Sequence, residues 1–95
     1  MELWDVLTTN RELTGRIAVR GEALRAGEYH LVVHIWLVND EWELLIQKRA
    51  ACVELAPNVW ATTGGSALAG EDSAAACARE LHEEIGVRAD MRNAE

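Results

Sequence analysis

The sequence predicts an α+β domain in which short strands come first and one helix follows at about residues 73–85. Runs of apolar and β-branched residues, separated by polar turns, fill the earlier part of the chain. The later stretch repeats its apolar residues at helical spacing and stops at a glycine. With 95 residues, 49% of them hydrophobic, the chain has room for one small packed domain.

The earlier part of the chain predicts a hairpin followed by two more strands. Residues 3–7 and 13–19 are apolar-rich and flank a Thr-Thr-Asn-Arg turn, which is typical of a hairpin. Residues 30–38, HLVVHIWLV, form a nearly continuous apolar run and predict a strand buried on both faces. After a turn at Asn39-Asp40, residues 42–47 are expected to form a strand antiparallel to it.

The stretch before the helix is less regular. Residues 50–58 are expected to be irregular and contain the only proline, Pro57. Residues 59–62 predict a short extended piece, which Gly64-Gly65 is expected to interrupt. No internal repeat is present.

Residues 73–85 predict an amphipathic helix. Ser73 is the expected N-cap, Gly86 the glycine after the last turn, and Val87 the start of another strand. At about 100° per residue, the apolar side chains share one arc of roughly 100°. The residues expected to face the core are Ala74, Cys77, Ala78, Leu81 and Ile85.

Charge and composition exclude several classes of protein. The net charge of -7 argues against binding nucleic acid or an anionic membrane through a basic face. No apolar run reaches the about 18 residues of a spanning helix, and Met1-Glu2 begins no signal peptide. Cys52 and Cys77 are interpreted as structural thiols in a reducing compartment. We therefore expect a cytoplasmic protein that needs a cation to accept anionic ligands.

The predicted helix carries three carboxylates in its last two turns: Glu80, Glu83 and Glu84. The helix dipole favours cations there, and Glu80 and Glu84 form a like-charge i,i+4 pair. Arg79 lies at i,i+4 to Glu83 and offsets one carboxylate. Two interpretations are open: a solvated acidic face, or a site at which hard oxygen ligands hold Mg²⁺ or Mn²⁺.

Residues upstream of the helix favour the cation site. Gly65 and Glu71 stand at set spacings before the carboxylates, which a solvated face does not require. The whole pattern consists of Gly65, Glu71, Arg79-Glu80-Leu81, Glu83-Glu84 and Gly86-Val87. It resembles the complete Nudix box, which spans residues 65–87. The resemblance covers roughly residues 28–88 and points to the branch related to isopentenyl-diphosphate isomerase.

The resemblance implies a mixed β-sheet between helices and a loop-helix-loop catalytic element. It also implies Mg²⁺- or Mn²⁺-dependent hydrolysis of a diphosphate bond in a nucleoside diphosphate linked to another group. The implied metal ligands are Glu80, Glu83, Glu84 and the carbonyl of Gly65. Glu71 would support the site and Arg79 would orient Glu83. Glu80 and Glu83 are both candidates for the general base.

Other residues have two interpretations each. Lys48 and Arg49 are candidates for phosphate contacts or form a solvated strand end. Trp60 is a candidate substrate wall, although packing is the more common role of tryptophan. His30 and His34 share a face of the predicted strand. They are interpreted either as a metal-binding pair or, more commonly, as partly buried side chains with hydrogen-bond partners.

The resemblance also implies strands and a closing helix after the box. Residues 1–95 are therefore expected to form a single, incomplete Nudix domain that associates as a homodimer. A diphosphate hydrolase and a weakly active or inactive remnant that binds metal or protein both stay open. An isomerase is less favoured, because Gly64 and Ser66 stand where the resemblance places the isomerases' cysteine and histidine.

Overall fold

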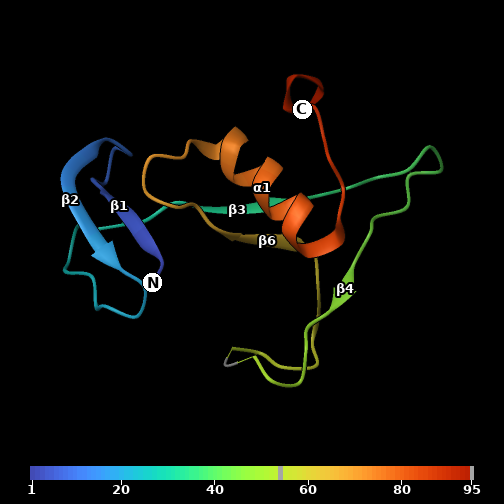
Figure 1. Cartoon of the computed structure of the whole chain (residues 1–95), viewed down its shortest axis with the longest axis horizontal. Coiled ribbons are helices and arrows are strands. Elements are labelled where there is room, and N and C mark those ends of the chain that lie inside the picture. The colour runs from blue at the N-terminus through green and yellow to red at the C-terminus, as the bar shows by residue number, and fades with distance from the viewer. Residues whose placement is uncertain (54, 95) are drawn as a thin grey trace.

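The structure, a computed structural model, describes residues 1–53 and 55–94. Figure 1 shows a hairpin at one end and a helix lying across strands β3 and β6 in the middle. At the other end lies an arm, residues 36–53 and 55–61, that carries β4. The α+β class is confirmed, because the described residues form small antiparallel sheets and one α-helix. Where the resemblance implied one mixed sheet, these residues pair in three separate two-stranded sheets.

The first sheet is the predicted amino-terminal hairpin. Strand β1 (Leu3–Leu7) pairs antiparallel with β2 (Leu13–Val19), and the register shifts between Asp5 and Leu7. Val6 and Ala18 are fully buried in it. The bounds of both predicted strands are confirmed.

The second sheet carries the start of the glycine-rich segment. Strand β3 (Val32–Ile35) pairs antiparallel with β6 (Thr63–Ser66), with Val33 opposite Gly65. Gly64-Gly65 therefore continue a strand, and the prediction that they interrupt one is wrong. A Cβ atom at Gly64 would collide with the carbonyl oxygen of Val33, so this close strand approach requires glycine.

The predicted strand at residues 30–38 is shorter than expected and is covered on one face. Val33 is 6% exposed, whereas Val32 and Trp36 are 44% and 72% exposed. Helix α1 packs against β3 and β6, and this accounts for the single covered face. A continuous apolar run is compatible with burial of both faces of a strand. It does not show that a second layer of structure is present to cover the other face.

The region after β3 departs most from the prediction. The strand expected at residues 42–47 is reduced to an isolated bridge between Val38 and Leu44. Strand β4 (Gln47–Lys48) pairs instead with β5 (Trp60–Ala61), which lies within the predicted extended piece. Val87 begins no strand, because the described chain after it forms only the short 3-10 helix η1 (Met91–Asn93).

Helix α1 (Ser73–Ile85) has the predicted bounds. Its N-cap is Asp72 and not Ser73, because Asp72 has an extended backbone and its Oδ1 accepts the amide of Ala75 at 2.8 Å. Gly86 ends the helix with a φ of 72°, as expected of a glycine at this position.

The core lies between α1 and the β3–β6 sheet. Val33, Ala67 and Ala76 form its buried cluster. The buried side of α1 is rotated relative to the predicted arc and overlaps it only in part. Leu81 is buried as expected, but Ala76 and Glu80 are buried as well, and Ala74 is exposed. This rotation takes the carboxylate of Glu80 to the sheet.

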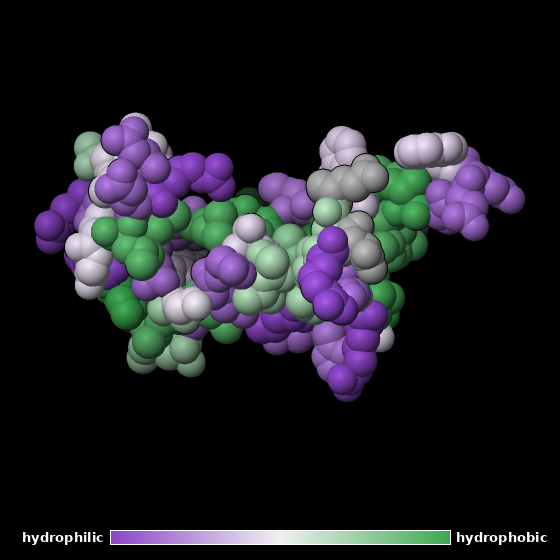
Figure 2. All heavy atoms as spheres, turned by 90° about the horizontal axis from the view of Figure 1, so that it is seen from above, coloured by the Kyte–Doolittle hydropathy of each residue, from purple (hydrophilic) through white to green (hydrophobic). Residues whose placement is uncertain are grey.

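Apolar side chains remain exposed at both ends of the molecule. Figure 2 shows apolar patches toward the hairpin end and toward the arm end, with a mixture of polar and weakly apolar residues between them. On the arm, the exposed large apolar side chains are Trp36, Val38, Trp42, Leu44, Leu45, Ile46, Leu55, Val59 and Trp60. No helix among the described residues is long and apolar enough to cross a bilayer.

Candidate active site

A tight loop joins β6 to α1 and orients Glu71. The amide of Glu71 donates to the carbonyl of Leu68 at 3.0 Å and closes a turn in which Gly70 has a φ of 88°. A positive φ at this place in a turn favours glycine. Oε1 of Glu71 also accepts the amide of Leu68 at 2.7 Å. The turn therefore fixes the position of the Glu71 carboxylate, and the carboxylate in turn stabilises the turn.

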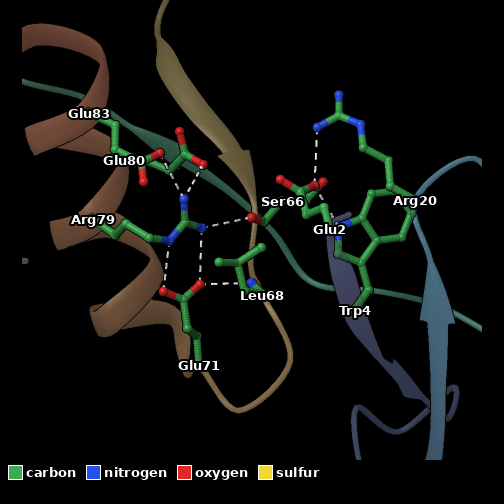
Figure 3. A network of polar contacts seen from close by, with 9 residues as sticks. All are labelled: Glu2, Trp4, Arg20, Ser66, Leu68, Glu71, Arg79, Glu80 and Glu83. Carbon is green, nitrogen blue, oxygen red and sulfur yellow. Dashed lines mark hydrogen bonds and ion pairs between the residues drawn. The ribbon is translucent and has the colours of Figure 1, made fainter.

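Arg79 of α1 meets Glu71 with one edge of its guanidinium. Its Nε donates to Oε2 of Glu71 at 2.8 Å, and its Nη2 donates to Oε1 at 3.0 Å. Figure 3 shows the two groups facing each other between the loop and the helix. Both side chains are about four-fifths buried, so water competes weakly for these bonds.

The same guanidinium gathers three further oxygen atoms. Nη1 donates to Oε1 of Glu80 at 3.0 Å and to Oε2 of Glu83 at 3.1 Å, the expected i,i+4 pair. Nη2 donates to the carbonyl of Ser66 at the end of β6 at 3.0 Å. Arg79 thus joins the sheet, the loop and the helix at one point (Figure 3).

Glu80 lies against Gly65. The glutamate is 8% exposed, and a Cβ atom built on Gly65 would lie 2.5 Å from its Oε1 and 2.9 Å from its Oε2. The absence of a side chain at Gly65 therefore makes room for this carboxylate. The carboxylate of Glu80 therefore occupies the space that a side chain at position 65 would fill.

Among the three carboxylates that contact Arg79, Glu71 and Glu80 differ in their affinity for a proton. Hydrogen bonding from Arg79 lowers the pKa of Glu71 below its ordinary value. Burial raises the pKa of Glu80, and the hydrogen bond from Arg79 opposes this rise only in part. Glu71 is thus the more firmly ionised group, and Glu80 takes up a proton more readily.

Glu84 is held by the arm and not by Arg79. The amide nitrogen of Gln47, in β4, donates to Oε2 of Glu84 at 2.5 Å and lies 3.4 Å from the hydroxyl of Thr63. These contacts attach β4 of the arm to the last turn of α1 and to β6. Sequence reasoning missed Gln47, because no local pattern links two residues 37 positions apart.

The carboxylate oxygens of the last two turns suit a hard divalent cation, although in this structure they contact other side chains of the protein. Arg79 contacts Glu80 and Glu83, and Gln47 contacts Glu84. Among the described residues, no three His, Cys, Asp or Glu side chains are arranged to hold a metal ion. The residues fit a divalent cation by their chemistry: the helix offers carboxylate oxygens, and the backbone beside them at Gly65 carries no Cβ atom.

The candidate substrate-side residues lie on the arm. Lys48 and Trp60 are exposed and face each other across the β4–β5 pair. Nε of Arg49 donates to the carbonyl of Leu55 at 3.0 Å, so this guanidinium is engaged in its own loop. Gln47 precedes Lys48 and contacts Glu84, which connects this part of the arm to the carboxylates.

The two histidines are not equivalent. His30 stacks on Trp4 with 3.9 Å between ring centroids, and its Nδ1 is buried without a hydrogen-bond partner in the described part of the chain. His34 is exposed in β3, opposite Gly64. The prediction that partly buried, hydrogen-bonded histidines fill both positions is therefore wrong.

A groove of about 410 Å³ runs between the hairpin and the start of α1. Leu7, Leu13 and Leu31 provide its apolar wall, while Arg11 and Glu71 contribute charge. It adjoins the Glu71 side of the Arg79 network. Glu71 therefore lies on a concave surface between the hairpin and the helix.

The sequence matches the NUDIX domain over residues 28–94, well over half of the chain. An uncharacterized Nudix hydrolase of Listeria monocytogenes is 50% identical over 92 residues, which cover 96% of this chain and 54% of that protein. Nudix hydrolase 3 of Arabidopsis thaliana is 40% identical over 89 residues, covering 92% of this chain and 12% of the plant protein.

An isopentenyl-diphosphate Delta-isomerase of Streptomyces avermitilis is 39% identical over 62 residues, covering 64% of this chain and 32% of the isomerase. No solved structure gives a significant match. The chain spans about half the length of the Listeria monocytogenes relative. That match covers 96% of the chain and so includes the hairpin, which precedes the matched NUDIX residues 28–94.

Proposed function

Because the chain belongs to the Nudix family, we propose that it hydrolyses a diphosphate bond in a nucleoside diphosphate linked to another group, with Mg²⁺ or Mn²⁺ as cofactor. The observation that carries this proposal is the Arg79 network, in which one guanidinium contacts Glu71, Glu80 and Glu83. With Gly65 packed on Glu80, the network brings the residues of the box together in space.

The proposal gives each residue of the box a role. The cation ligands would be Glu80, Glu83, Glu84 and the carbonyl of Gly65. A divalent cation held there would lower the pKa of a bound water and neutralise charge on the diphosphate. Glu71 and Arg79 would orient the helix carboxylates. Glu83 and Glu80 remain the two candidates for the general base, and the raised pKa of Glu80 supports it as a group able to hold a proton.

The substrate side of the proposal rests on charge and position. A chain with a net charge of -7 attracts a diphosphate only where local cations offset that charge. Lys48 and Trp60 would provide a cation and an aromatic surface on the arm. Arg49 would have to release the carbonyl of Leu55 before it could contact phosphate.

The proposed environment is the cytoplasm, with a small-molecule diphosphate and no nucleic acid or membrane as partner. We also propose a homodimer, supported by large exposed apolar side chains on the arm, such as Trp36 at 72% and Trp60 at 62%. Light scattering at high protein concentration tests this part, and a well-folded monomer would contradict it.

The activity is tested by phosphate release from a panel of nucleoside diphosphates, nucleoside triphosphates and sugar nucleotides, with and without Mg²⁺. The wild-type protein is compared with Glu84→Gln, and Glu12→Gln on the hairpin turn serves as a control at an exposed carboxylate. The proposal expects metal-dependent turnover in the wild type and the control, and its loss in Glu84→Gln. Absent turnover on every substrate, or equal turnover in Glu84→Gln, would contradict it.

The alternative is a non-catalytic domain that binds metal or a protein partner. It is supported by the helix carboxylates, which contact Arg79 and Gln47 and form no metal-binding cluster among the described residues. Mn²⁺ binding without turnover on the panel would favour this alternative. Isomerase chemistry is less favoured, since Gly64 and Ser66 offer neither a thiol nor an imidazole.

A further inference from the structure

The hairpin contacts the loop that leads into α1 through two hydrogen bonds. The carbonyl of Leu3 accepts the amide of Ala69 at 2.8 Å. Oδ2 of Asp5 accepts the amide of Gly70 at 2.7 Å, across 65 positions of sequence. Both hairpin residues precede the matched NUDIX residues 28–94.

Gly70 is the point at which these contacts reach the active-site network. It lies in the turn with a φ of 88° and directly precedes Glu71. The carboxylate of Glu71 holds Arg79 through two hydrogen bonds, and Arg79 contacts Glu80 and Glu83. A displacement of Gly70 therefore moves the oxygen atoms that orient the guanidinium.

Asp5 is the only side chain in this pair of hairpin contacts, because Leu3 acts through its backbone. Aspartate is disfavoured inside strands, and a hairpin has no need of it opposite Ile17 in β2. An ionised acceptor forms a shorter and stronger bond to an amide than a neutral acceptor does. The contact with Gly70 gives a physical reason for a carboxylate at this position.

We propose that Asp5 is a positioning residue for the diphosphate-cleaving site, acting through the Gly70 amide on Glu71 and Arg79. Its catalytic consequence rests on the proposed function, whereas its effect on Arg79 does not. The hairpin is thus part of the framework of the site, although it lies before the matched NUDIX residues.

The test compares Asp5→Val and Asp5→Asn with the wild-type protein. Valine has nearly the size of aspartate and favours strands, so the hairpin folds without the acceptor. Asparagine keeps an oxygen that accepts the Gly70 amide. Each variant is measured by its kcat and KM with Mg²⁺, by its melting temperature, and by the NMR signals of the Gly70 amide and the Arg79 Nε–H. Glu12→Ala on the hairpin turn is the matched control.

Asp5→Val is expected to lower kcat about 10-fold with KM little changed, to speed exchange of the Gly70 amide and to shift the Arg79 Nε–H signal. Asp5→Asn is expected to restore most of kcat and both signals, and Glu12→Ala to match the wild type. An unchanged Arg79 signal in Asp5→Val, or an Asp5→Asn variant as impaired as Asp5→Val, would overturn the proposal.

The proposed function can fail separately. If the wild-type protein hydrolyses no substrate, the Arg79 signal alone decides the role of Asp5. A shift in Asp5→Val that Asp5→Asn reverses supports positioning, and no shift overturns it.

Discussion

Arg79 and Glu71 face each other as a fork on a fork, with Nε to Oε2 at 2.8 Å and Nη2 to Oε1 at 3.0 Å. The pair joins the loop after β6 to the second turn of α1. Because Nη1 remains available on the other side, the same guanidinium also reaches Glu80 and Glu83. The planar shape of arginine is what allows one side chain to serve all three carboxylates.

We predict that Arg79→Lys destabilises the protein and lowers its activity. A lysine cannot donate in the fork geometry, so the loss is expected to be about 1–3 kcal/mol in the free energy of unfolding, with a roughly 10- to 100-fold lower kcat. Urea unfolding and Mg²⁺-dependent hydrolysis measure both effects. Arg92→Lys is the control, because Arg92 is 89% exposed in its pair with Asp90 and is expected to change little. Equal behaviour of the two variants would contradict the account.

We predict that Gly65→Ala separates activity from stability. The new Cβ would lie 2.5 to 2.9 Å from the carboxylate of Glu80, whose flexible side chain can move away. Unfolding free energy is therefore expected to change by about 1 kcal/mol or less, while hydrolysis falls at least about 10-fold. Ser66→Ala keeps the carbonyl that Arg79 contacts and is the control. A fully active Gly65→Ala variant would show that the position of Glu80 against Gly65 is not needed.

The Arg16–Glu28 pair predicts a pH dependence of stability. Hydrogen bonding from Arg16 lowers the pKa of Glu28 from 4.5 to about 2. Because the folded pKa lies below the unfolded one, this contribution is present above about pH 4.5 and is lost as the pH falls toward 2. At neutral pH the wild-type protein should have a higher melting temperature than Glu28→Gln. The two melting temperatures should converge near pH 2. In an Arg16→Gln background, Glu28→Gln should alter the pH profile much less, since only the weaker contribution of the Arg25 amide remains. An unchanged difference there would refute this assignment.

Trp42 predicts a stabilising substitution. It has a φ of 61°, a conformation that bulky residues rarely adopt, and it is 89% exposed. Trp42→Asn is expected to raise the free energy of unfolding by about 1 kcal/mol, since asparagine tolerates this conformation and little burial is lost. Trp36→Asn is the control, because Trp36 is also exposed and lies outside the positive-φ region. Urea unfolding that shows no gain for Trp42→Asn over Trp36→Asn would contradict the strain argument.

Local pattern was sufficient for the hairpin and for the ends of α1. Apolar-rich runs around a polar turn located β1 and β2, and Gly86 located the end of the helix. The N-cap was wrong because Asp72 and Ser73 are both good capping residues, and only backbone geometry decides between them. The box spacing identified Gly65, Glu71 and Arg79 together. In the structure Arg79 contacts Glu71 directly and is connected to Gly65 through Glu80.

The contacts that position this site lie between distant segments, and no periodicity reports them. Asp5 meets Gly70 and Gln47 meets Glu84 only after the hairpin and the arm have folded onto the loop and the helix. The rotation that buries Glu80 has the same origin, because the sheet under α1 decides which side of the helix is covered. The arm was mispredicted because strand pairing depends on partners that a single run of residues does not reveal.

The central claim is that the carboxylates of α1 hold a divalent cation for diphosphate hydrolysis. The most direct measurement is a Mn²⁺ titration followed by electron paramagnetic resonance, on the wild-type protein and a Glu80→Gln, Glu84→Gln double variant. The account predicts saturable binding to the wild type and a loss of affinity of at least about 10-fold in the double variant. Equal Mn²⁺ affinity in the two proteins would contradict it.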